Sequence, residues 1–171
     1  MANVQAAVEA VLRQEDSTLS GRITEIAGDA GGLTRFGFAS AFHPELRETT
    51  FYTTMTNADA LQLAKEKMTR EYAEPLWIGA IGDQALATKV LSYGVNECPQ
   101  RAIEALQNAV IVIHPGLRLK VDGVMGPQTM EAVNRCMAGS LLNAFRLHMI
   151  ERYVVYAKDN VLRGLIDRAL A

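Results

Sequence analysis

Apolar residues recur at helical spacing in segment after segment of this 171-residue chain. In the first segment, Val4, Val8 and Val11 stand three or four residues apart and therefore share one face of a helix. Five of these segments open either after a residue able to cap a first helical turn or at a proline that such a turn tolerates. We expect helices after Asn3, Thr56 and Asp83, from Pro99 and Pro127, over 142–156 and over 161–170.

Two short extended runs, 22–27 and 33–39, stand on either side of the glycine-rich segment 28–32 and predict a small β-hairpin. The chain shows no strand–helix–strand alternation and no repeat of fixed period. The expected fold class is therefore mainly α, an α+β domain with six to seven helices and one hairpin near residues 22–39. The loop 114–123 separates two helical halves.

Charge and hydropathy argue against several kinds of partner. Lys and Arg number 17 against 19 Asp and Glu, and the basic residues are spread along the chain, so no nucleic-acid partner is expected. The longest apolar stretch, 109–113, is far shorter than the roughly 20 residues that span a bilayer, so no stable membrane insertion is expected. Residues 1–5 do not resemble a secretory signal. We expect a monomer made in the cytoplasm without a signal peptide.

Metal and cofactor chemistry has no visible motif in this sequence. The two cysteines and three histidines are scattered, and none of the histidines stands three or four residues from another histidine or a cysteine. No glycine-rich dinucleotide or phosphate-binding motif occurs. We expect no metal and no cofactor, and we interpret Cys98 and Cys136 as two core thiols.

Glu15 continues the apolar stripe of the first helix, because eleven residues separate it from Val4 and eleven steps of about 100° return to nearly the same direction. Desolvation and the negative end of the helix dipole would both favour a protonated carboxyl there. Such a group can act as a general acid. The alternative is that Glu15 marks a frayed helix end and points into water.

Asp29 and Thr34 follow soon after this carboxylate, in the segment that predicts a hairpin. A glycosidase needs one group to protonate the leaving oxygen and a second to hold water or face the cationic sugar. Asp29 and Thr34 suit that second role, and the neighbouring glycines would let backbone approach a glycan. The alternative is a turn-forming aspartate and a strand threonine.

Several motifs together resemble glycoside hydrolase family 108, the muramidases and secretion-activating proteins. The family's V-L-x-x-E-G-G resembles V-L-R-Q-E at 11–15, although Asp16 and Ser17 stand where two glycines are usual. Its D-P-G-G-x-T-x-x-G-I-S resembles the segment 29–40, and its R-x-x-Y-W-x-P and aromatic-x-x-V-N segments resemble 70–75 and 93–96. Its closing R-G-W-x-N-R resembles 163–168.

The second half contains V-D-G-V-M-G-P-Q-T at 121–129, which is similar to a signature of small peptidoglycan-binding modules. The alternative reading of this motif is a turn followed by a helix that starts with proline. The resemblance implies a lysozyme-like catalytic domain over 1–97 and a helical peptidoglycan-binding-like module over 98–171, packed closely together.

By position, the resemblance places the family's proton-donating glutamate on Glu15, and by analogy with phage-type lysozymes Asp29 and Thr34 would hold a water molecule. Arg35, Tyr93 and Asn96 are the candidate substrate-binding residues. The implied activity is hydrolysis of the β-1,4 bond between N-acetylmuramic acid and N-acetylglucosamine in peptidoglycan, as a phage or prophage endolysin.

Two other functions remain open from the sequence. The protein could be a lytic transglycosylase, or it could be a non-catalytic protein that binds the cell wall or regulates secretion. Without a signal peptide, the protein would reach the wall after release through a holin-type pore or through delivery by a secretion system.

Overall fold

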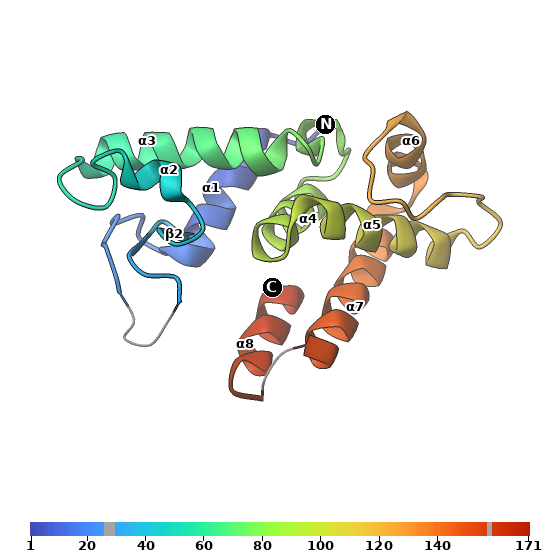
Figure 1. Cartoon of the computed structure of the whole chain (residues 1–171). Coiled ribbons are helices and arrows are strands. Elements are labelled where there is room, and N and C mark those ends of the chain that lie inside the picture. The colour runs from blue at the N-terminus through green and yellow to red at the C-terminus, as the bar shows by residue number, and fades with distance from the viewer. Residues whose placement is uncertain (26–29, 157–158) are drawn as a thin grey trace.

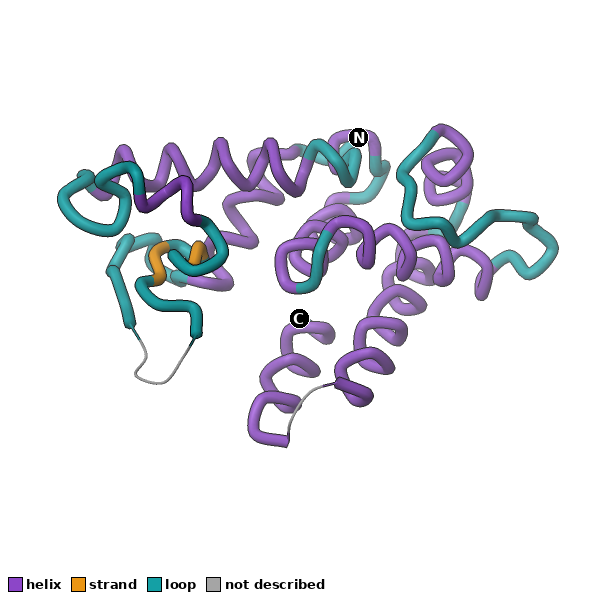
Figure 2. The backbone as a smooth tube through the Cα atoms, viewed as in Figure 1, coloured by secondary structure: helices purple, strands orange, loops and turns teal. Residues whose placement is uncertain are grey.

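The computed structural model describes residues 1–25, 30–156 and 159–171. Within these ranges the chain forms eight α-helices, a short π-helix, a 3-10 helix and one two-stranded antiparallel sheet (Figure 1). Figure 2 shows that helices make up most of the backbone and that both strands lie in one small hairpin. The predicted fold class, mainly α with a small hairpin, is confirmed.

The helices fall into two groups along the chain. The first comprises α1 (Val4–Glu15), α2 (Pro44–Arg47), α3 (Asn57–Met68), the π-helix η1 (Thr69–Ala73), the 3-10 helix η2 (Ile78–Ala80) and α4 (Gln84–Asn96). The second comprises α5 (Pro99–Ile113), α6 (Pro127–Arg135), α7 (Ala138–Tyr156) and α8 (Asp159–Leu170).

The helix starts lie where the capping residues predict them. The side chains of Asn3, Thr56 and Asp83 each accept a hydrogen bond from a backbone N–H in the first turn of α1, α3 and α4. Pro99 and Pro127 are the first residues of α5 and α6, where a missing N–H costs nothing. These predictions are confirmed; among the described elements, the four-residue α2 and the 3-10 helix η2 were not predicted.

The hairpin lies in a narrower segment than expected. Strand β1 (Thr34–Arg35) pairs with β2 (Phe38–Ala39), and the chain reverses at Phe36 and Gly37, whose φ angles are +51° and +81°. Two left-handed residues are typical of the tight turns whose twist matches paired strands. Thr24 also pairs with Thr34 in an isolated antiparallel bridge, which agrees with the predicted pairing of the runs 22–27 and 33–39. Residues 28 and 29 of the predicted turn lie outside the described residues.

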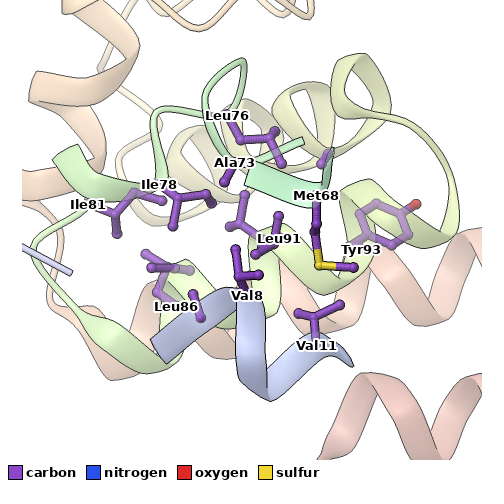
Figure 3. Close-up of a cluster of buried hydrophobic side chains, with 14 of the residues drawn as sticks. Val8, Val11, Met68, Ala73, Leu76, Ile78, Ile81, Leu86, Leu91 and Tyr93 are labelled. Carbon is purple, nitrogen blue, oxygen red and sulfur yellow. The ribbon is translucent and has the colours of Figure 1, made fainter. Parts of the chain in front are cut away.

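A buried apolar cluster holds α1 against the rest of the first group (Figure 3). Val8 and Val11 on α1 face Met68 at the end of α3 and Leu91 on α4, and none of the four side chains is more than 1% exposed. Each such side chain contributes about 1.5–3 kcal/mol when it is removed from water. The cluster therefore fixes the position of the last turn of α1, which carries Glu15.

Three aromatic rings join α4 to α7. Tyr93 is 1% exposed and makes edge-to-face contacts with Phe145 and Tyr153, with ring centroids 5.7 and 5.9 Å apart. Helix α5 also packs against both α4 and α7. These contacts cross residue 97, and the division into 1–97 and 98–171 stays a prediction.

The loop that carries V-D-G-V-M-G-P-Q-T is organised by Gln107 on α5. Its amide nitrogen donates to Asp122, to the carbonyl of Val124 and to the hydroxyl of Thr129, while its amide oxygen accepts from the backbone N–H groups of Asp122 and Gly123. Gln107 is 1% exposed, so these bonds satisfy an amide that would otherwise be costly to bury. The motif therefore has a structural role in this chain.

Burial raises the pKa of the tyrosine hydroxyls that pack between helices, including Tyr93 and Tyr153, and raises that of Tyr52 to about 12. These pKa values exceed that of an unfolded tyrosine, about 10. The folded state therefore keeps protons that the unfolded state loses, and the tyrosine contribution to stability is lost as the pH rises through the folded-state values.

We therefore expect the free energy of unfolding, measured by urea denaturation, to fall as the pH rises above about 10. Tyr93→Phe should have a shallower fall than the wild type, because the substitution removes one of these protons. Identical pH dependence in the two proteins would contradict this explanation.

Candidate active site

Glu15 is the last residue of α1, and its side chain is 24% exposed. Its Oε1 lies 2.9 Å from Nη1 of Arg168 on α8. The residue as a whole is exposed, and this ion pair holds its carboxylate against α8. The arginine partner comes from a helix far along the chain and was not predicted.

The loop after Glu15 is closed by Asp16, one of the two residues that replace the glycines of the family motif. The Asp16 carboxylate accepts hydrogen bonds from the backbone N–H of Gly21, at 2.7 Å, and from the hydroxyl of Ser20. Partial burial raises the pKa of Asp16, but these hydrogen bonds outweigh it and hold the pKa below its usual value. The departure from the family motif thus leaves an ordered loop beside Glu15.

The tip of the hairpin packs directly against the Glu15 side chain. A Cβ built on Gly37 would lie 2.7 Å from Cγ of Glu15, a distance that real Cβ contacts do not show. The φ of +81° also favours glycine at this position. Gly37 therefore allows the hairpin to approach the carboxylate closely.

A main cleft of about 390 Å³ opens on one side of this contact. Its wall combines carboxylates, an amide, an imidazole and several aromatic rings, a mixture suited to a sugar, which has both polar and apolar faces. Phe42 is 72% exposed. The cleft is lined by Glu15, Phe36, Gly37, Phe38, Ala39, Phe42, His43, Met68, Tyr72, Val95, Asn96 and Glu97.

A smaller side hollow of about 270 Å³ also borders Glu15, Phe36 and Gly37. Thr34 lies in its wall, together with Asp16 and polar residues of the segment 17–24. Glu15 therefore borders two hollows, and the structure brings Glu15 and Thr34 to the same one. Asp29, the third predicted catalytic residue, lies outside the described residues.

Three polar residues of the main cleft were missed from the sequence: His43, Tyr72 and Glu97. Burial, followed by the nearby Lys67 ammonium, lowers the pKa of His43. Glu97 directly follows α4 and pairs with Arg152 on α7 at 2.8 Å. Glu97 could have been found from the sequence, because it directly follows the predicted residue Asn96.

Arg35 was predicted to bind substrate, but it borders neither of the two hollows beside Glu15. It is 5% exposed, and its guanidinium donates to the backbone carbonyls of Gly21, Phe51 and Met55. Arg35 therefore lies neither in the cleft wall nor on the solvated surface. Its fork of donors instead joins three separate loops.

We expect Arg35→Met to lower the free energy of unfolding by about 3 kcal/mol, because buried carbonyls lose their donors. Urea denaturation measures this loss, and Arg35→Lys should recover only part of it, because an ammonium cannot match the fork. A loss of activity with unchanged stability would instead support a substrate-binding role.

The two other predicted binding residues lie in different surroundings. Tyr93 packs in the core between α4 and α7 and contributes no wall to the main cleft. Asn96 does line the cleft, and its Nδ2 donates to the hydroxyl of Tyr153 at 2.9 Å. Of the three, only Asn96 shares a cleft with Glu15.

Across 1–25, 30–156 and 159–171, no cluster of three or more potential metal ligands occurs. In the same ranges, no helix combines the length and the apolar character needed to cross a bilayer.

Comparisons with known proteins give a fold likeness. No family model matches the chain, and no curated protein matches it. Among solved structures, Brucella abortus SagA is similar with a TM-score of 0.65 and 16% sequence identity over 95% of both chains. The two proteins therefore share a fold along nearly their whole length.

Proposed function

We propose that this protein is a peptidoglycan hydrolase of the muramidase type, with Glu15 as its general acid. The observation that carries the proposal is the position of Glu15, partly buried between the main cleft and a side hollow that also contains Thr34. A glycosidase needs this arrangement: an acid beside the bond to be cleaved, and a polar space where water can be held.

In the proposed reaction, protonated Glu15 donates its proton to the glycosidic oxygen while water attacks the anomeric carbon. The Thr34 hydroxyl would hold this water from the side hollow, and Asp29 would complete the set. The proton leaves with the sugar oxygen, and water supplies the new hydroxyl, so the products are a reducing N-acetylmuramic acid end and a free N-acetylglucosamine end.

Two further observations support the proposal. The motifs at 11–15 and 29–40 resemble those of glycoside hydrolase family 108, and the fold is like that of Brucella abortus SagA along nearly the whole chain. We accordingly propose membership of that family, a glycan strand as the partner, and action at the cell wall after holin-type release or delivery by a secretion system.

The experiment is digestion of purified peptidoglycan, followed by mass spectrometry of the soluble products. Reducing-end N-acetylmuramic acid is the expected result. Release of no sugar by a folded protein that binds peptidoglycan would overturn the proposal in favour of a wall-binding protein.

A lytic transglycosylase is the second candidate, because that reaction relies on one glutamate and uses the sugar's own 6-hydroxyl in place of water. Among the described residues, the other carboxylate of the main cleft, Glu97, is already paired with Arg152. The same mass spectra separate the two reactions, since transglycosylase products carry anhydro ends and are lighter by one water.

A further inference from the structure

The ion pair between Glu15 and Arg168 brings together the end of α1 and the last turn of α8. Figure 1 shows α8 beside α7, with its last turn directed toward α4. Arg168 borders neither the main cleft nor the side hollow. Its guanidinium therefore contacts the carboxylate without contributing a wall to the space for the glycan.

Other contacts hold the backbone of this turn independently of the Arg168 side chain. Lys89, which is 5% exposed on α4, donates to the Arg168 carbonyl at 2.7 Å, and Arg146 on α7 donates to the Ala171 carbonyl at 3.3 Å. Ala169 is fully buried. The helix end is thus fixed by its backbone and by a buried methyl group, which leaves the Arg168 side chain directed at Glu15.

We infer that Arg168 is a positioning residue, which fixes the direction of the Glu15 carboxyl through their 2.9 Å contact. The inference rests on the proposed function. The contact restricts the side-chain rotation of a residue that must meet one glycosidic oxygen.

Other charged and titratable groups face this pair from the surrounding elements. His43, Tyr72 and Glu97 share the main cleft with Glu15, and Asp16 and Arg22 share the side hollow. On the Arg168 side, Lys89 and Arg146 add positive charge, and Tyr153 lies close enough for Arg168 to lower its pKa in part. In the part of the chain that the structure describes, Glu15 forms its ion pair with Arg168.

The test compares wild type, Arg168→Gln and Arg168→Lys on soluble glycan strands, with kcat and KM measured separately. In Arg168→Gln we expect kcat to fall about tenfold through lost orientation, with KM unchanged. Arg168→Lys keeps a cation that can hold the carboxylate, so it should recover most of the lost kcat.

Arg163→Gln is the matched control, because it removes the same charge from an exposed position on α8. Its kcat and KM should match those of the wild type. If Arg168→Gln and Arg168→Lys lose activity equally, Arg168 is structural and the inference fails. It also fails if Arg168→Gln behaves as the wild type.

A second measurement separates this inference from the proposed function. The order of the Glu15 side chain, whose carboxyl carbon is assigned by its absence in Glu15→Gln, can be measured by NMR relaxation without substrate. Lower order in Arg168→Gln than in the wild type supports the role of the pair, even if no variant cleaves glycan and the proposed function fails. Unchanged order overturns the inference, whatever the activity.

Discussion

Glu15→Gln is expected to lower the rate of glycan cleavage by about a thousandfold, the size of effect that a positioned general acid supplies. Glutamine has nearly the same shape as glutamate but cannot donate a proton to a leaving oxygen. Its partner Arg168 keeps 26% exposure of its side chain, so water can replace the lost ion pair and the fold should persist. Mass spectrometry of released muropeptides measures the loss.

The matched control for this substitution is Glu66→Gln, which makes the same chemical change at an exposed position on α3. It should retain wild-type activity, and both variants should melt within a few degrees of the wild type. Substantial cleavage by folded Glu15→Gln would assign the acid to another residue, and the proposal would then be wrong about the site.

Gly37→Ala is expected to lower activity by about ten- to a hundredfold, because small displacements of a catalytic group have effects of this size. The new methyl group would lie 2.7 Å from Cγ and 3.1 Å from Cβ of Glu15, so the acid side chain must move. The left-handed backbone adds a stability cost of about 1–2 kcal/mol. Activity assays at saturating substrate, together with urea denaturation, measure both effects.

Gly123→Ala separates backbone strain from displacement of Glu15. Gly123 lies in the loop between α5 and α6 and has a φ of +69°. A Cβ on Gly123 would lie 2.6 Å from Cγ of Gln100 on α5. This variant should lose comparable stability and keep its activity on soluble glycan strands. Equal loss of activity in both variants would show that strain, and not the contact with Glu15, is the cause.

Local signals explain why the sequence predicts most of the helices. Capping by Asn3 and Asp83 and the apolar spacing around Val8 act within a few residues, so they can be recognised without the fold. The tight turn at Phe36 and Gly37 was not predicted, because Phe36 has a left-handed conformation, which a bulky residue rarely adopts.

The candidate site was predictable where helical spacing or a local motif marks it. Periodicity singled out Glu15, and motifs singled out Thr34 and Asn96. Arg168 comes from a helix that folding brings close to Glu15, so no local pattern indicated it. The role of Arg35 depends on the carbonyls of Phe51 and Met55, whose proximity no local pattern indicates. From the sequence alone, Arg35 was interpreted as a substrate-binding residue, whereas the structure places it in the interior.

The Gln107 contacts change what V-D-G-x-x-G-P-x-T can be used to infer. Its aspartate, its first glycine and its threonine all bond to one glutamine, which lies fifteen residues before Asp122. Chains that combine this signature with a glutamine at that spacing are expected to share the loop, whatever they bind. As a search pattern it therefore reports architecture.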